Sequence, residues 1–128
     1  MARSWLAWCD PHCYRNYYTW AGAFAYVAAL NASTFAGHND WRLPNVKELQ
    51  SIVNYEYVNP SVSPEFNDCA NGSCTCSPCN VGLDGFYWSS TSLASHPHEA
   101  WKVIFNVGSV ITDLKSFTFQ VRAVRGGL

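Results

Sequence analysis

The first regular pattern along the chain is helical. Between residues 20 and 30, apolar side chains recur at the three- and four-residue spacing of a single helix face. Thr19 precedes this run, and a threonine in that position accepts a backbone hydrogen bond at a helix start. The sequence therefore predicts a helix from Thr19 to about Asn31. Its apolar face is formed by Trp20, Ala23, Phe24, Val27 and Leu30.

A second helix is expected directly after Pro44. Asn45 is a favourable N-cap, and Glu48 stands three residues later, where it completes a capping box. We expect this helix to end near Tyr55. Its apolar face is formed by Val46, Leu49, Ile52 and Val53.

From residue 86 onward the hydrophobic period changes to two, which is typical of strands. The pattern predicts strands over residues 86–91, 101–107, 110–112 and 117–124. Val107-Gly108 predicts the tight turn that leads into the third of these strands. The expected core face of the sheet carries Trp88, Trp101, Phe105, Phe117 and Phe119. Two helices followed by an antiparallel meander indicate one α+β domain over residues 1–128.

The composition excludes several classes of partner. Hydrophobic residues make up 48% of the chain and charged residues only 13%, with a formal net charge of −1. The basic residues are scattered from Arg3 to Arg125 instead of forming a stripe, which disfavours nucleic acid. The longest apolar segment, 21–30, is shorter than the ~20 residues that cross a membrane. No signal peptide is visible, so we expect either that one has been removed or that export depends on something outside this sequence.

Residues 59–84 form a predicted long, irregular loop, because Pro, Ser, Asn, Gly and Cys replace the periodic pattern. The chain has an even number of cysteines, which favours disulfides in an oxidising compartment and leaves the pairing open. Zinc is the alternative, because Cys74-x-Cys76-x2-Cys79 would bring three thiolates together. The disulfide candidates are Cys9, Cys13, Cys69, Cys74, Cys76 and Cys79.

Catalytic motifs are weak. Ser89, Ser90 and the segment 96–99 (His-Pro-His-Glu) are close in sequence, but no Gly-x-Ser-x-Gly turn presents a serine nucleophile. The same segment contains residue types that bind first-row metals, although a turn between strands explains its proline and polar residues equally well. We therefore expect no enzyme activity, no metal and no cofactor.

Six dispersed motifs resemble one bacterial family. They are Thr19-Trp20-x2-Ala23, Asp40-Trp41-Arg42-Leu43-Pro44-Asn45-x2-Glu48-Leu49, Tyr87-Trp88-Ser89-Ser90, Ala100-Trp101-x-Val103-x-Phe105, Gly108 and Val121-Arg122-x-Val124-Arg125-Gly126. In order and spacing, the chain from about Trp5 to Gly127 is similar to the C-terminal domain of Legionella collagen-like adhesins.

The resemblance implies a C-type-lectin-like fold, more distantly related to the formylglycine-generating enzyme, in which the terminal strands pair. It also implies an exported or surface-attached bacterial protein that mediates adhesion, including adhesion to sulfated polysaccharides. Two features depart from the family. The insert 69–79, rich in cysteine, is not part of the common pattern, and the near-neutral charge disfavours a sulfated ligand. No cysteine follows Cys79, so the oxidase activity of the enzyme is not carried over.

Distinctive aromatic, apolar and paired residues are expected to hold the scaffold. For Arg42 we expect bonds to loop carbonyls or to a carboxylate such as Asp40 or Glu48. The residues assigned to structure are Trp20, Trp41, Arg42, Leu43, Pro44, Glu48, Trp88, Trp101, Arg122 and Arg125.

The resemblance to lectin-like folds implies a ligand surface between the loop after Trp88 and the strands up to Phe119. The candidate contacts are Ser92, His96, His98, Lys102, Asn106, Thr112, Lys115, Ser116 and Thr118. Our leading interpretation is a non-enzymatic extracellular module that binds a glycan or protein on a cell or matrix surface. The alternatives are a structural subunit of a surface oligomer or filament, and a retroelement-diversified receptor-binding protein of a bacterium or phage.

Overall fold

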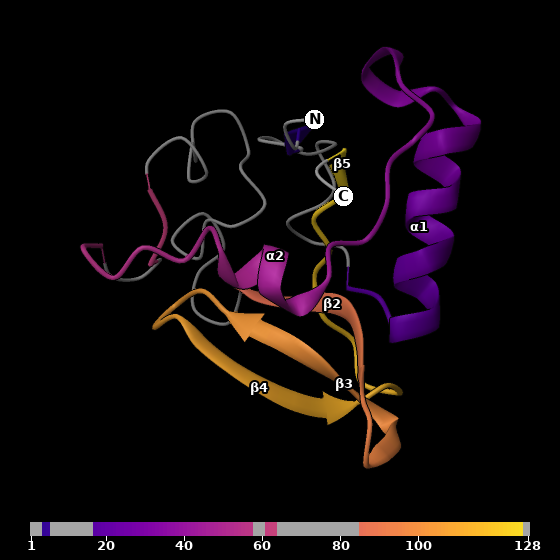
Figure 1. Cartoon of the computed structure of the whole chain (residues 1–128). Helices are drawn as coiled ribbons and strands as arrows, with labels where there is room; N and C mark the ends of the chain where they lie inside the picture. Colours follow the sequence, from indigo (N-terminus) through magenta and orange to yellow (C-terminus); the bar gives the residue numbers. More distant parts are fainter. Residues whose placement is uncertain (1–3, 6–16, 58–60, 64–84, 127–128) are drawn as a thin grey trace.

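A computed structural model describes residues 4–5, 17–57, 61–63 and 85–126 (Figure 1). All six cysteines, and with them the predicted disulfides and the cysteine-rich loop, lie outside these residues. The described elements are β1 (Ser4–Trp5), α1 (Trp20–Ala32), the 3-10 helix η2 (Phe35–Gly37), α2 (Val46–Gln50), β2 (Phe86–Leu93), β3 (His96–Ile104), β4 (Ser109–Leu114) and β5 (Val124–Arg125). The predicted α+β class is confirmed.

Helix α1 lies where the periodicity placed it. The Thr19 side chain accepts a hydrogen bond from the backbone nitrogen of Gly22 at 3.1 Å, so the helix has the expected N-cap. Ala23, Val27 and Leu30 point into the core. Phe24 does not: its side chain is 41% exposed, and the apolar face of α1 is narrower than the sequence indicated.

Helix α2 is shorter than predicted. The capping box is present, with Asn45 and Glu48 bonded in both directions. The helix nevertheless ends at Gln50 and not near Tyr55. The backbone tightens into i to i+3 hydrogen bonds after the helix, and Val53 instead forms an isolated β-bridge with Val62. The extended pairing of Val53 therefore competes with the helix and ends it.

Strands β2, β3 and β4 form an antiparallel sheet in which β3 is central. The segment 96–99 was expected in a turn, and this expectation is wrong. The turn is Ala94–Ser95, and residues 96–99 open β3. Pro97 is tolerated in the central strand because the pairing with β4 begins only at Glu99. β3 also ends earlier than predicted, at Ile104, and residues 105–108 form the next turn.

The sheet is covered on both faces where β2 and β3 pair. Figure 1 shows α2 above the sheet. The core cluster on the α2 side consists of Leu49, Ile52, Val62, Tyr87, Val103 and Phe105. The second cluster joins the sheet to α1 and the C-terminal segment, and consists of Ala23, Val27, Leu30, Trp41, Leu43, Trp88, Ala100, Val121 and Ala123.

The C-terminal segment is not the long alternating strand that the sequence predicted. β5 has two residues, and residues 121–124 are all buried, so there is no solvent face. Phe117 is 49% exposed and the expectation that it lies in the core is wrong: the backbone nitrogen of Phe117 bonds the carbonyl of Leu114, which holds Phe117 in a turn. β5 does pair with β1, as the resemblance implied.

Gly108 occupies a turn that only glycine fits. Its φ is +78°, and a Cβ there would lie 2.6 Å from Tyr55 Cε1 and 2.8 Å from Val53 Cγ1. Gly37 has a similar φ of +81°, but a Cβ there meets no atom within 4 Å. A substitution at Gly37 therefore introduces backbone strain alone, whereas one at Gly108 introduces backbone strain and steric overlap.

We expect Gly37→Ala to lower the free energy of unfolding by about 1 kcal/mol, the cost of a left-handed backbone. Gly108→Ala should lower it by about 2 kcal/mol more, because overpacking adds to the same strain. Chemical denaturation of both variants measures the difference. Equal losses for the two variants would contradict the close packing of Tyr55 and Val53 on this turn.

Candidate functional site

The segment 41–44 (Trp-Arg-Leu-Pro) connects four parts of the fold. Asn31 of α1 bonds both backbone groups of Trp41, at 2.7 and 2.9 Å. The backbone of Arg42 bonds that of Val124 in β5, at 2.8 and 2.9 Å. Pro44 accepts a hydrogen bond from the backbone nitrogen of Ser90 in β2 at 2.8 Å. Helix α1, β2, β5 and α2 are thus fixed to one short stretch of backbone.

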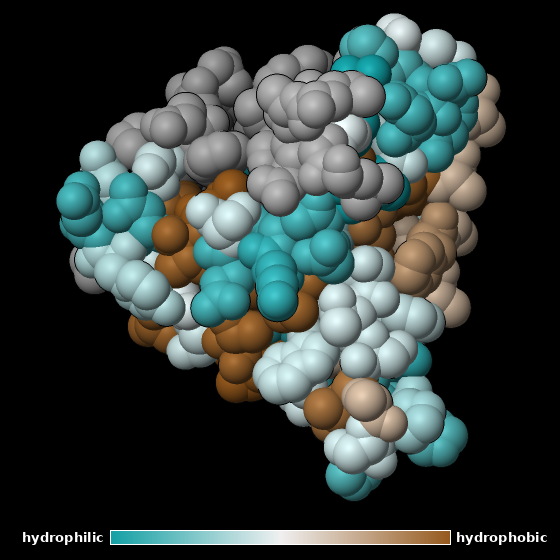
Figure 2. Space-filling view, viewed as in Figure 1, coloured by the Kyte–Doolittle hydropathy of each residue, from teal (hydrophilic) through white to brown (hydrophobic). Residues whose placement is uncertain are grey.

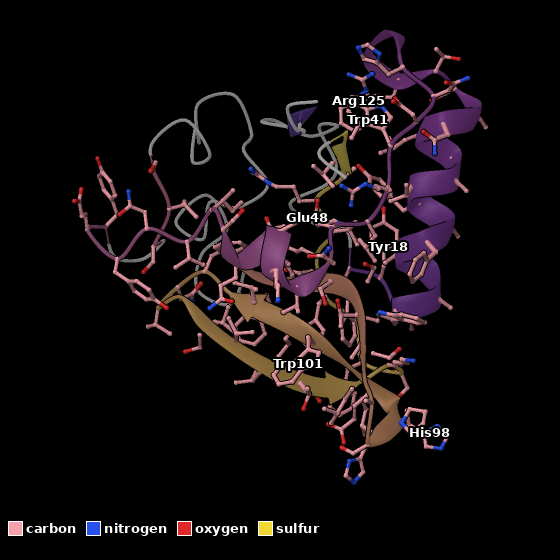
Figure 3. All side chains as sticks on the ribbon, viewed as in Figure 1. Tyr18, Trp41, Glu48, His98, Trp101 and Arg125 are labelled. Atoms are coloured by element: carbon pink, nitrogen blue, oxygen red, sulfur yellow. The ribbon has the colours of Figure 1, made fainter. Side chains whose placement is uncertain are left out.

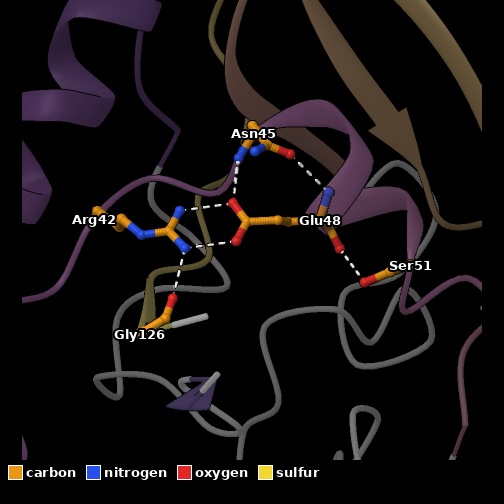
Figure 4. Close-up of polar contacts among 5 residues, drawn as sticks. All are labelled: Arg42, Asn45, Glu48, Ser51 and Gly126. Carbon is orange, nitrogen blue, oxygen red and sulfur yellow. Dashed lines mark hydrogen bonds and ion pairs between the residues drawn. The ribbon is translucent and has the colours of Figure 1, made fainter. Parts of the chain in front are cut away.

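The Arg42 side chain completes this junction (Figure 4). Its guanidinium donates two hydrogen bonds to the Glu48 carboxylate, at 2.6 and 2.5 Å, and a third to the carbonyl of Gly126 at 2.7 Å. Glu48 is 4% exposed, and it also accepts from the backbone of Asn45. The hydrogen bonds to Glu48 raise the pKa of Arg42. Both charges are used internally, so the junction is a scaffold and presents no charge to a ligand.

Nearby, Asp40 and Arg125 form an exposed pair at 2.7 Å. The hydrogen bond from Arg125 lowers the pKa of Asp40. A lowered pKa means that the pair stabilises the fold above the unfolded pKa of the carboxyl and that this contribution is lost as the pH falls through the folded value.

We therefore expect the wild-type melting temperature to exceed that of Asp40→Asn slightly at neutral pH, and the gap to close below about pH 4. Thermal melts of both proteins across the acid range measure it. In a protein that carries Arg125→Ala, adding Asp40→Asn should leave the melting temperature unchanged at every pH. A gap that persisted unchanged at low pH would show that Asp40 acts by something other than this ion pair.

Most of the candidate residues, partly or fully exposed, gather with three apolar side chains at one end of the molecule, which we call the hairpin-end surface. Three elements meet there at Lys115. Its carbonyl accepts from the backbone nitrogen of Trp20 at 3.1 Å, its own nitrogen donates to His98 at 2.9 Å, and its ammonium donates to Ser92 at 2.8 Å. The surface consists of Phe24, Ser92, His96, His98, Leu114, Lys115, Ser116, Phe117 and Thr118.

The Lys115 ammonium is held in place on this surface. It lies 3.9 Å from the centre of the Trp20 ring, within the range of a cation–π contact, in addition to its bond to Ser92. Trp20 in turn donates its indole N–H to the carbonyl of Ser89 at 3.0 Å and packs edge-on against Phe24. Lys115 and the aromatic rings beneath it are therefore pre-oriented.

Apolar side chains on the same surface are half exposed. Phe24, Leu114 and Phe117 are 41%, 44% and 49% exposed. His98 projects from the hairpin end away from the body of the molecule (Figure 3). In Figure 2 the lower end of the molecule mixes hydrophilic and hydrophobic residues. Rings and hydrogen-bonding groups at one end suit a ligand that has both apolar and polar faces.

Three predicted contacts, Lys102, Asn106 and Thr112, do not belong to this surface. Lys102 is 3% exposed, because its ammonium turns inward to Asp113 at 2.7 Å and lies 4.0 Å from the centre of the Phe119 ring. Asn106 lies in the turn after β3, at the far end of that strand, and its Oδ1 is buried. Our expectation that Lys102 is accessible to a ligand is therefore corrected, whereas Asn106 is partly exposed at the opposite end of β3. Thr112 is partly buried, and its hydroxyl donates to Glu99 at 3.0 Å.

The described histidines His38, His96 and His98 are not grouped with other metal-ligand side chains. Across the described ranges, no three His, Cys, Asp or Glu side chains come together as a metal ion would require. His98 and Glu99 are consecutive strand residues, so their side chains leave β3 on opposite faces. The side chains of His98 and Glu99 therefore do not point toward one another within the strand.

The remaining residues assigned to structure lie in or against the core. Trp88 is fully buried, and its indole donates to the carbonyl of Tyr18 at 2.8 Å. Trp101 is partly buried, and its carbonyl accepts from Ser89. Arg122 is 1% exposed, and burial lowers its pKa to about 10. Trp88 and Arg122 are therefore unavailable to a ligand, whereas Trp101 keeps part of its surface exposed.

The sequence reasoning missed Phe24, Leu114 and Phe117 as surface residues. Phe24 was assigned to the apolar face of the first helix and Phe117 to the core face of the sheet, while Leu114 was not assigned. For Phe117 a signal existed: the polar Lys115-Ser116 pair marks a turn between two strands, and a residue in a turn is commonly exposed.

Together these features define a small α+β domain whose ends are joined by β1 and β5 and whose scaffold leaves one mixed apolar and polar surface exposed. The chain belongs to the Lcl C-terminal domain family, whose sequence model matches residues 2–125. No curated protein matches the sequence. Within the described residues, no helix is both long and apolar enough to pass through a membrane. Family membership is consistent with an adhesin-like role at a bacterial surface.

Proposed function

We propose that this domain is a non-enzymatic, secreted or surface-attached module of C-type-lectin-like fold that binds a glycan or protein on a cell or matrix surface. The observation that carries the proposal is the hairpin-end surface, where half-exposed Phe117 and Leu114 stand beside the fixed Lys115 and the exposed His98. Membership in the Lcl family supports a role in adhesion. The antiparallel pairing of β1 and β5 supports the lectin-like closure.

A variant at the opposite end of β4 tests whether binding is located at the hairpin-end surface. Purified protein is applied to arrays of immobilised glycans and surface proteins, and we expect saturable binding. Tyr55→Ala should retain it, because Tyr55 bonds Gly108 just before β4, whereas the hairpin-end surface begins at Leu114, at the other end of that strand. Loss of binding in Tyr55→Ala would place the site elsewhere, and no binding by the wild type would refute the proposal.

Assembly is the second candidate function. Tyr55 and Val107 are 70% and 64% exposed, more than the other large hydrophobic residues of the described chain, and subunit contacts bury such side chains. Sedimentation separates the two roles. A monomer with saturable ligand binding supports the first, and a discrete oligomer that dissociates on Tyr55→Ala and binds no ligand supports the second.

A further inference from the structure

We infer that the ligand of the hairpin-end surface is an uncharged glycan, an inference that rests on the proposed binding function. The argument follows from where each positive charge of the described chain is placed. A polyanion such as a sulfated polysaccharide binds through several accessible cations, and its binding weakens steeply as salt rises.

Most cations of the described residues are already neutralised or buried. Arg42 is paired with Glu48, Lys102 with Asp113, and Arg125 with Asp40. Arg122 lies in the core, 1% exposed. These arginines and Lys102 therefore add little positive field to the surface.

Two lysines are left. Lys47 is on α2 and outside the hairpin-end surface. Lys115 is on it, but its ammonium is already shared between the Trp20 ring and the Ser92 hydroxyl. In the rest of the sequence, Arg3 and Arg15 are outnumbered by Asp10, Glu65, Asp68 and Asp84. One cation on the surface is too few to hold a polyanion.

The other groups on the surface suit a neutral sugar. Ser116 and Thr118 are exposed hydroxyls that both donate and accept, as sugar hydroxyls do, and the imidazole of His98 adds a further polar group. Phe117, 49% exposed, offers a ring on which the apolar C–H face of a pyranose packs. The geometry thus combines an aromatic platform with neutral hydrogen-bonding groups.

A protein ligand fits this surface less well. Along 114–118 the apolar Leu114 and Phe117 are separated by Lys115 and Ser116, and Thr118 follows. A protein interface has a contiguous apolar core within a polar rim. Apolar side chains that stand next to polar ones match a small sugar, which has an apolar C–H face and polar hydroxyl groups.

The test uses three immobilised probes: neutral oligosaccharides that end in glucose, galactose, mannose or N-acetylglucosamine; heparin; and matrix protein stripped of its glycans. Affinity is measured at low and at high sodium chloride, at neutral pH. We expect a neutral oligosaccharide to bind with an affinity that changes less than about twofold, against losses of about a thousandfold for binding through many phosphate-like contacts.

Each other outcome has a distinct meaning. Binding to heparin that collapses at high salt, or binding only to the stripped protein, would overturn the uncharged-glycan inference and leave the proposed binding function standing. Saturable binding to none of the probes and to no surface on the arrays would overturn both.

Discussion

Arg42→Ala is expected to lower the free energy of unfolding by about 3 kcal/mol and the melting temperature by roughly 10 °C, without direct loss of ligand contacts. The reason is the state of Glu48 after the change. Its carboxylate, whose side chain is 5% exposed, loses the two charge-assisted hydrogen bonds that the guanidinium donates in a buried setting. Gly126 also loses its donor. Denaturant unfolding of the purified variant measures the loss.

Arg125→Ala is the matched control. Arg125 forms a similar bidentate pair, but its partner Asp40 is exposed and is rehydrated when the arginine is removed. Its effect on stability should therefore be far smaller than that of Arg42→Ala. An Arg42→Ala protein that melts like the wild type yet has lost binding would contradict the scaffold role of Arg42.

Trp88→Ala is expected to cost about 4 kcal/mol, the largest loss of any single change considered. Trp88 is fully buried, packs edge-on against Phe119 with 4.8 Å between ring centres, and donates to the carbonyl of Tyr18. Removal of the indole opens a cavity between the sheet and the C-terminal segment. It also removes one of two hydrogen bonds that the Tyr18 carbonyl accepts, the other being donated by the backbone nitrogen of Phe119.

Trp88→Phe keeps the prediction testable if the alanine variant fails to fold. It retains most of the packing and loses the hydrogen bond, so about 1–2 kcal/mol is expected. Tyr55→Ala removes a ring of comparable size that is 70% exposed and should cost no more than about 1 kcal/mol. A Trp88→Ala loss as small as that of Tyr55→Ala would contradict the central place of Trp88 in the core.

The features that sequence predicted best depend on neighbours in the chain. The Thr19 cap of α1 and the capping box of Asn45 and Glu48 follow from spacing over three residues, and both are present. Arg42 is a partial case: the sequence proposed Glu48 among several partners, and the structure selects Glu48 and the carbonyl of Gly126.

The features that sequence missed depend on distant segments. Lys102 alternates with apolar residues and was expected on the surface, but the C-terminal segment covers that face with Phe119, and Asp113 of β4 neutralises the charge. Helix α2 ends early because Val53 pairs with Val62. Periodicity along one segment carries no information about which other segment covers it.

The ligand surface was predicted only in part. Sequence and resemblance brought Ser92, His98 and Lys115 into one candidate set, and the fold joins them through hydrogen bonds. Phe117 was assigned to the opposite environment, because an aromatic residue two positions before Phe119 resembles the inner face of a strand. The turn from Leu114 to Phe117 breaks that alternation and moves the ring to the surface.

The central claim is that the scaffold and the ligand surface are separate, with binding at the hairpin end. The most direct measurement compares ligand affinity and melting temperature for Phe117→Ala and the wild type on the same array. We expect the variant to melt close to the wild type, because Phe117 is 49% exposed, and to lose about tenfold or more in affinity. Wild-type affinity in a folded Phe117→Ala protein would contradict the claim.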